Sequence, residues 1–329
     1  MKGLNPEIVK GFGYKLETYT HFRNSFICET NQGIKVIQAV DGDIPQLLFQ
    51  HSAKEHLYQN GFKWVDRFYI SENNAPYYIH EGTAYVMTDW VDGRECDFDH
   101  LEDIKKAIST LADMHKVSKG LIPLEGSRIR YDERSLPLVV QKRISELTTM
   151  KKRINRQSHM SEFDLIFLKY YKYYEELCKR SLEWLNRSNY NETKEKVKKE
   201  KCFCHNDYTY YNLLIAPSGA LYVTHFEECR YGLPIYDLVS VLKKIMKKHN
   251  WDITIANELL SLYMDKVNID DEKNLLVSLL ILPDDFLKVC NRYYNTRRAW
   301  ASQSLLRKLN LIIEQKENVA QFIKYIESL

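Results

Sequence analysis

The stretch Cys204-His205-Asn206-Asp207-Tyr208-Thr209-Tyr210-Tyr211-Asn212, which runs into the apolar residues Leu213-Leu214-Ile215, decides the fold. It predicts a loop that carries an aspartate and, after four intervening residues, an asparagine. Phosphoryl transfer from ATP uses this arrangement, because the aspartate orients the acceptor hydroxyl and accepts its proton while the asparagine holds a magnesium ion. We therefore assign Asp207, with His205 beside it, as catalytic residues, and Asn212 as a ligand of cofactor and metal.

The segment after this loop departs from that chemistry. Residues 212–215 and 221–226 are short apolar runs separated by Pro217-Ser218-Gly219, which predicts a β-hairpin. The hairpin would place Asn212 and His225 on adjacent backbone segments. His225 stands where a kinase needs its second magnesium-binding aspartate, and magnesium binds imidazole weakly.

Two acidic residues could restore the metal site. Strand alternation would put Glu227 on the same face as His225, and Glu228 follows it. We therefore expect Glu227 as the second metal ligand if a metal binds. A zinc site built from nearby cysteines and histidines is an alternative, but neither Cys-x-x-Cys nor His-x-x-x-His spacing is present, so buried free cysteines are the plainer interpretation.

Size and composition indicate a folded protein with one large or two packed domains. The chain has 329 residues, of which 44% are hydrophobic and 28% charged, and its net charge is only +3. This balance gives no sign of a nucleic-acid or anionic-membrane surface. No apolar run approaches the roughly 20 residues that span a bilayer, and the start lacks the apolar core of a secretory signal. Seven scattered cysteines fit a reducing compartment.

The first 92 residues predict a small β-rich lobe. Residues 25–30 and 34–40 flank the turn Asn31-Gln32-Gly33 and form a hairpin pattern. Residues 47–60 have apolar side chains at helical spacing, and residues 84–91 predict a further strand. Strand, strand, helix and strand is the order of a small nucleotide-binding lobe.

Residues 93–329 predict a larger, mostly helical lobe. Apolar residues 101–115 share one helical face, which includes His115, and Ser161 is a suitable N-cap for a second long helix. After the catalytic-type loop we expect five more helices, over residues 236–249, 255–267, 272–282, 284–300 and 302–329. The basic stretches 150–156 and 194–201 are interpreted as solvated helix ends, with a phosphate-facing role as the alternative.

The chain resembles the aminoglycoside and choline phosphotransferase group of kinase-like proteins, and within it the CotS family of bacterial spore-coat proteins. The passages that carry the resemblance span nearly the whole chain: residues 59–62, 90–98, 202–212, 236–238, 250–252 and 291–295. It implies an α+β, two-lobed protein-kinase-like fold of the aminoglycoside phosphotransferase type. It also implies that Asp237 braces the catalytic loop, with an ordinary helix N-cap as the alternative.

The resemblance also implies where a nucleotide would lie. Gln38, Glu55, Met87, Asp89, Asn212 and His225 would be its cofactor-binding residues.

Position 38 is the first departure from the family pattern in the small lobe. The pattern has a lysine where this chain has Gln38, and an amide cannot neutralise phosphate charge. Lys35 is a poor substitute, because alternation places it on the opposite strand face. Glu55, the expected partner of that lysine, is then left without it.

The loop before the hairpin is the second departure in this lobe. The loop, residues 19–24, has no glycine to form a phosphate cradle.

The leading hypothesis is a pseudokinase with a structural or assembly role in the spore coat, with weak or absent binding of ATP and magnesium. Its partners would be other spore-coat proteins, and it would be made in the mother-cell cytoplasm before it joins the coat. The alternatives are an active ATP-dependent phosphotransferase that uses Asp207 as base on a small hydroxylated molecule, and an interaction module whose cleft binds a peptide or sugar.

Overall fold

The computed structural model describes residues 3–40, 43–133, 135–295 and 301–329. The chain folds into two compact units: Met1–Asp132 with Val197–Asp237, and Glu133–Lys196 with Leu238–Leu329. The first unit combines the β-rich N-terminal part with the catalytic-type loop. The lobe boundary expected after residue 92 stays a prediction.

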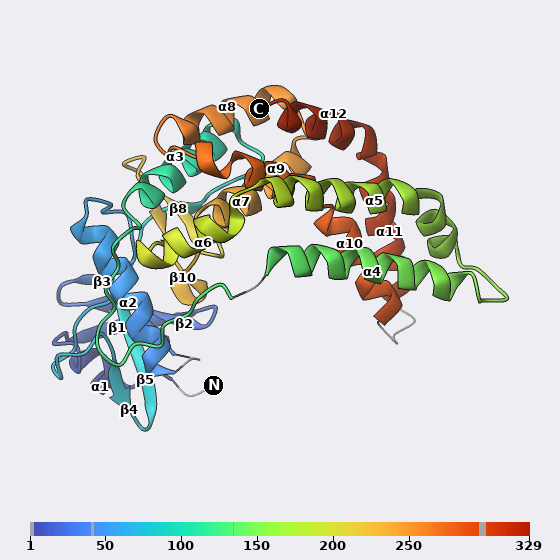
Figure 1. Ribbon diagram of the computed structural model, residues 1–329. Helices are drawn as coiled ribbons and strands as arrows, with labels where there is room; N and C mark the ends of the chain where they lie inside the picture. The colour runs from blue at the N-terminus through green and yellow to red at the C-terminus, as the bar shows by residue number, and fades with distance from the viewer. Residues whose placement is uncertain (1–2, 41–42, 134, 296–300) are drawn as a thin grey trace. The chain divides into compact units, whose positions relative to one another are not determined.

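The first unit contains all the strands that the described residues form (Figure 1). Its elements before the crossover to the second unit are α1 (Pro6–Lys10), β1 (Leu16–Phe22), β2 (Ser25–Thr30), β3 (Gly33–Ala39), α2 (Ile44–Gln59), β4 (Tyr78–His80), β5 (Thr83–Asp89), β6 (Arg94–Glu95) and α3 (Leu101–Lys116). After the crossover come β7 (Phe203–Cys204), the 3₁₀ turn η1 (Tyr210–Asn212), β8 (Leu213–Ile215), β9 (Leu221–Val223), the 3₁₀ turn η2 (Phe226–Glu228) and β10 (Arg230–Tyr231).

Five of these strands form an antiparallel sheet in the order β1-β2-β3-β5-β4. Side chains alternate across it, so Ile37 and Met87 enter a core cluster with α1, while Val86 packs with Leu47 of α2 on the other face. The predicted hairpin 25–40, helix 47–60 and strand 84–91 are confirmed as β2–β3, α2 and β5.

The loop expected at residues 19–24 is largely strand β1, which pairs with β2 from Leu16 to Phe22. Only Arg23 and Asn24 turn the chain. The strand escaped prediction because nearly all of its side chains are exposed, so no alternation of apolar and polar residues marks it.

The second unit consists of helices. They are α4 (Leu136–Ile154), α5 (Glu162–Arg187), α8 (Ile253–Met264), α9 (Lys273–Ile281), α10 (Asp284–Asn295), α11 (Ala301–Glu314) and α12 (Lys316–Glu327), with the 3₁₀ turn η3 (Asp270–Glu272). Helices α6 (Tyr190–Lys199) and α7 (Ile235–Lys248) each contribute residues to both units. Ser161 caps α5 in a capping box with Asp164, as its position predicts.

The predicted helix 302–329 is wrong, because the chain forms α11 and α12 with a break at Gln315. The Gln315 side chain accepts from Trp251 and donates to the Lys247 carbonyl, at 3.0 and 3.1 Å. These tertiary hydrogen bonds hold the break between α11 and α12, which no proline or glycine marks in the sequence. The end of the predicted helix 284–300 lies outside the described residues.

The passage 291–295 fastens helices within the second unit. Tyr293 stacks on Phe163 of α5 with 3.8 Å between ring centroids, and the Tyr294 hydroxyl donates to Asp164 at 2.8 Å. Asn291 donates to Glu146 of α4 at 2.9 Å. This part of the resemblance is therefore explained by packing.

Candidate active site

The catalytic-type loop brings Asp207 and Asn212 together. The Asn212 amide nitrogen donates to the Asp207 carboxylate at 2.9 Å and to the Asp207 carbonyl at 2.8 Å. Asn212 is buried while Asp207 is half-buried. The amide nitrogen is therefore committed to the loop, and the Asp207 carboxylate is held in one direction.

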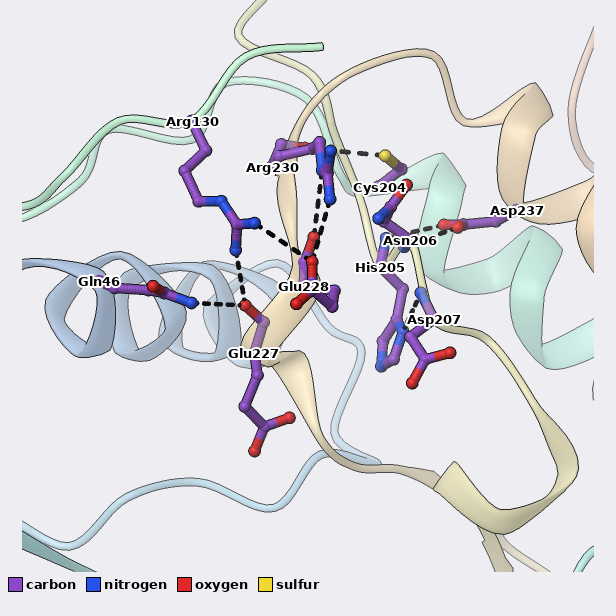
Figure 2. A network of polar contacts seen from close by, with 10 residues as sticks. All are labelled: Gln46, Arg130, Cys204, His205, Asn206, Asp207, Glu227, Glu228, Arg230 and Asp237. Atoms are coloured by element: carbon purple, nitrogen blue, oxygen red, sulfur yellow. Dashed lines mark hydrogen bonds and ion pairs between the residues drawn. The ribbon is translucent and has the colours of Figure 1, made fainter. Parts of the chain in front are cut away.

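Asp237, at the start of α7, braces this loop. Its two carboxylate oxygens accept from the backbone N–H groups of His205 and Asn206, each at 2.7 Å (Figure 2). His115 of α3 lies 3.2 Å from the same carboxylate. Asn206 has a positive φ of 64°, which is uncommon for a residue other than glycine, and these bonds hold it there. The bracing role that the resemblance implies is present in this chain.

His205 links the loop to the end of the following hairpin. Its Nδ1 accepts from the Asp207 N–H at 3.2 Å, so Nε2 carries the proton and donates to the Thr224 carbonyl at 3.0 Å. Burial lowers the pKa of His205, which keeps the ring neutral. In this structure His205 positions the loop rather than facing a substrate.

The predicted hairpin is confirmed as β8 and β9, and the Thr224 N–H donates to the Asn212 carbonyl at 3.0 Å. The strand ends at Val223, however, and His225 has a left-handed φ of 62°. Alternation therefore does not apply to Glu227, which belongs to η2. The two side chains still meet, with 3.4 Å between His225 Nδ1 and Glu227 Oε1.

This contact brings an imidazole and a carboxylate together, and the two groups shift each other's pKa. Burial alone would raise the pKa of Glu227, but the hydrogen bond and charge of His225 lower it to about 2. The same hydrogen bond raises the pKa of His225 against the effect of burial. Each group therefore favours the charged form of the other.

The backbone of η2 is fixed by donors from two other segments. Gln46 of α2 and Arg130 both donate to the Glu227 carbonyl at 2.9 Å, and Arg130 and Arg230 bind the Glu228 carboxylate. Figure 2 shows the Glu227 and Asp207 carboxylates pointing away from this network. The carboxylate of Glu228, the alternative metal ligand, is thus bound by two arginines.

A cavity of about 730 Å³ lies against the face of the sheet that carries Val36 and Val86. This volume is in the range of small-molecule and cofactor sites. Four of the predicted site residues line it: Gln38, Asp89, His225 and Glu227.

The other five predicted site residues are absent from the lining: Glu55, Met87, His205, Asp207 and Asn212. Met87 alternates with Val86 and is buried in the core cluster with α1. Glu55 forms a two-pronged ion pair with Arg67, with both N···O distances at 2.7 Å. Its expected lysine partner is replaced by this arginine.

Lys54 of α2 lines the cavity, and the sequence interpretation missed it. The side chain is 2% exposed, and its ammonium lies 3.0 Å from both the carbonyl oxygen and Oδ1 of Asp66. It also lies 3.8 Å from the centre of the Phe68 ring. A signal was available, because Lys54 shares the helical face of Leu47, Gln50 and Leu57, all of which are buried.

Lys35 occupies the other face of β3, as alternation predicts. It pairs with Asp89 at 2.5 Å, and its ammonium lies over the Tyr69 ring. Lys35 is absent from the lining of the cavity. It therefore does not replace the missing lysine at position 38.

The donor set does not fit a magnesium site. Of the two predicted metal ligands, Asn212 hydrogen-bonds through its amide nitrogen to Asp207, and Glu227 contacts His225, whose imidazole magnesium binds weakly. Within the described ranges, no three His, Cys, Asp or Glu side chains are grouped so that they could hold a metal ion. The zinc alternative has no support there either, since all seven cysteines are free and buried.

Comparison with known proteins identifies the family. The family model described as "Spore coat putative kinase YutH" matches residues 5–326. The chain belongs to this spore-coat kinase family. It is 24% identical to spore coat protein S of Bacillus subtilis (strain 168) over 305 residues, which cover 92% of this chain and 86% of that protein.

Solved structures confirm the kinase-like α+β fold. An aminoglycoside phosphotransferase from Alicyclobacillus acidocaldarius superposes with a TM-score of 0.87 at 20% identity, over 100% of this chain and 97% of that one. The spectinomycin phosphotransferase APH(9)-Ia, in complex with ADP and spectinomycin, gives 0.58 at 15% identity over 98% of each chain. None of the helices in the described part of this family member combines the length and apolar composition that a bilayer crossing needs.

Proposed function

We propose that the protein is a spore-coat pseudokinase, which keeps its cavity as a nucleotide site but transfers phosphate poorly or not at all. The observation that carries this proposal is the His225–Glu227 ion pair, 3.4 Å across, at the place where the chemistry needs an aspartate–magnesium contact. Imidazole binds magnesium weakly, and protonation of the ring, which Glu227 favours, would add a repulsion of the metal ion. Gln38, which lines the same cavity, is neutral where the family pattern has a positively charged lysine.

The relatives support the cellular part of the proposal. Spore coat protein S is named for the coat, and the match to it covers most of both chains. We therefore place this protein in the mother-cell cytoplasm and then in the coat, with other coat proteins as partners. A fluorescent fusion that stays outside the coat of mature spores would contradict this localisation.

The nucleotide part of the proposal is supported by the size of the cavity and by related folds. The spectinomycin phosphotransferase was solved with ADP, and the amicoumacin kinase hAmiN with AMP-PNP, Ca²⁺ and Ami. Calorimetric titration of ATP with magnesium and then with EDTA tests the proposal. We expect weak binding that changes less than about threefold on metal removal, because no fitting metal site is present. Tight, magnesium-dependent binding would contradict the proposal.

A second function is favoured by the intact loop. The Asn212 hydrogen bond and the contacts of Asp237 hold Asp207 in a fixed direction. A catalytic base that acts on a small hydroxylated substrate needs such a fixed position. Incubation with labelled ATP and a set of hydroxylated metabolites separates this function from the pseudokinase. Transfer that disappears in Asp207→Asn would establish the active enzyme and overturn the pseudokinase.

A further inference from the structure

Lys54 brings a positive charge to the cavity from an unexpected element. We propose that the Lys54 ammonium holds the phosphate groups of a nucleotide in this cavity, in place of the lysine that position 38 lacks. The inference rests on the proposed nucleotide site and names the residue that makes it work. Kinase-like proteins supply this charge from the third strand, whereas here it would come from helix α2.

The position of Lys54 meets the first requirement of this role. Lys54 and Gln38 line the same cavity, one from α2 and the other from β3. Lys54 is turned inward by the helix itself, because Leu47, Gln50 and Leu57 on the same face are also buried. The cation that faces the cavity is therefore fixed by the fold and does not depend on a flexible surface chain.

The contacts of Lys54 leave it able to bind a ligand. The ammonium has three N–H donors, and two of its close contacts are the carbonyl oxygen and Oδ1 of Asp66, each at 3.0 Å. Asp66 lines the cavity as well. Only the contact with the carbonyl oxygen is a hydrogen bond and the contact with Oδ1 is an ion pair, so a further N–H is available to a phosphate oxygen while the pair with Asp66 stays formed, as a lysine–acid pair does in working kinases.

Apart from Asp66, which pairs with Lys54 itself, each acidic residue around the cavity has a basic partner of its own. The pairs are Asp43–Arg128, Asp66–Lys54, Asp89–Lys35, Glu95–Arg23 and Glu227–His225. Among the described residues that line the cavity, only Arg23 and Lys54 are a lysine or an arginine. Arg23 is exposed and bound to Glu95. Lys54 is thus the buried cation at the site.

The surroundings of Lys54 would strengthen its contact with an anion. Its ammonium lies 3.8 Å from the Phe68 ring centre and 5.7 Å from that of Phe226. Apolar rings exclude water, and an ion pair is screened less where water is excluded. Solvent would therefore screen the attraction between Lys54 and a phosphate group less than it would at the exposed Arg23.

The test is the binding of three probes to the full-length protein by calorimetry in EDTA. The probes are ATP, adenosine and inorganic tripolyphosphate, and the variants are Lys54→Met, Lys54→Met/Asp66→Asn and Lys35→Met. The double variant keeps the test valid if Lys54→Met unfolds, because it also neutralises the acid that the single change leaves alone. Lys35→Met is the matched control, since Lys35 is also a buried lysine paired with an aspartate, but the lysine itself does not line the cavity.

We expect ATP and tripolyphosphate to bind Lys54→Met and the double variant about 10- to 100-fold more weakly, which is typical for the loss of a charged hydrogen bond. Adenosine should bind all forms alike, and Lys35→Met should stay within about twofold of wild type for every probe. A double variant that binds ATP as tightly as wild type would overturn the inference and leave the nucleotide site standing. Wild-type protein that binds tripolyphosphate through Lys54 but neither ATP nor adenosine would overturn the proposed function and support the lysine. Wild-type protein that binds none of the three probes would overturn both.

Discussion

The two faces of the five-stranded sheet each have a lysine–aspartate pair, but in different surroundings. Lys35 stands opposite Asp89 in register on β3 and β5, and its side chain lies on the face that packs against α1. Lys54 reaches the other face from α2, where its partner Asp66 borders an open cavity. The comparison shows that burial and pairing alone do not mark a functional lysine. What distinguishes Lys54 is that the lysine itself lines space for a ligand, whereas Lys35 does not.

The largest expected effect on stability comes from breaking the Lys54–Asp66 pair, and it is measured against the effect of breaking the Lys35–Asp89 pair. Lys54→Met should lower the free energy of unfolding by roughly 3 kcal/mol, because Asp66 is largely buried and is left without a counter-ion. Lys35→Met should cost at most about 1 kcal/mol, since the Asp89 side chain is 65% exposed and water solvates it. Urea unfolding of both variants measures the difference.

The double variant Lys54→Met/Asp66→Asn serves as the control for this interpretation. It should recover most of the loss, because no unpaired charge remains. Equal costs for the two single variants would show that the surroundings of the pairs are energetically alike.

Neighbouring residues of β3 sharpen the comparison between the faces. Ile37→Ala should cost about 2–4 kcal/mol, because Ile37 is fully buried in the cluster with α1 and its loss leaves a cavity. Val36→Ala should cost about 1 kcal/mol, since Val36 already borders open space. Urea unfolding of both variants gives the two costs. A Val36→Ala loss as large as that of Ile37→Ala would mean that the cavity is filled by side chains in solution.

Two buried histidines of the first unit should make its stability respond to acid. Burial lowers the pKa of both His51 of α2 and His205 of the catalytic-type loop. Near the ordinary histidine pKa of 6.5 the unfolded chain therefore binds more protons than the folded one, so stability is full above this pH and falls as the pH drops below it. Each histidine contributes at most about 1.4 kcal/mol per pH unit.

The contribution of His205 is isolated by comparing wild type with His205→Gln in urea unfolding at pH 7.5 and 5.5. Wild type should lose more stability between these two values than the variant does, because glutamine does not titrate. His225 titrates in both proteins and cancels in this comparison. A slope that is unchanged in the variant would show that His205 is not held neutral by the fold.

How far the sequence predicts this molecule depends on how local each signal is. Asp207 and Asn212 lie five positions apart on one short loop, and the turn Pro217-Ser218-Gly219 fixes the hairpin after it, so both were predicted. Glu227 was assigned its place by strand alternation, which fails because the chain leaves the strand at Thr224. The contact with His225 depends instead on the left-handed backbone at position 225.

Lys54 shows why part of the site was missed. A lysine within a helix is ordinarily taken for its solvent face, and its burial here depends on Asp66 and Phe68. These residues belong to a segment without regular structure, so no periodicity reveals where they lie. Glu55, one position further on, was selected instead because of the family pattern.

Glu55 and Lys54 together give the smallest expected effect and the finest comparison. Glu55→Gln should lower the free energy of unfolding by less than about 1 kcal/mol, because Arg67 is half-exposed and can be solvated. ATP affinity should stay within about twofold of wild type, since Glu55 lies outside the cavity lining while its neighbour Lys54 lies within it. Calorimetry and urea unfolding check the two values. A loss of ATP affinity in Glu55→Gln comparable to that in Lys54→Met would mean that the Glu55–Arg67 pair sets the position of α2, and that the cation reaches the ligand only when this pair is formed.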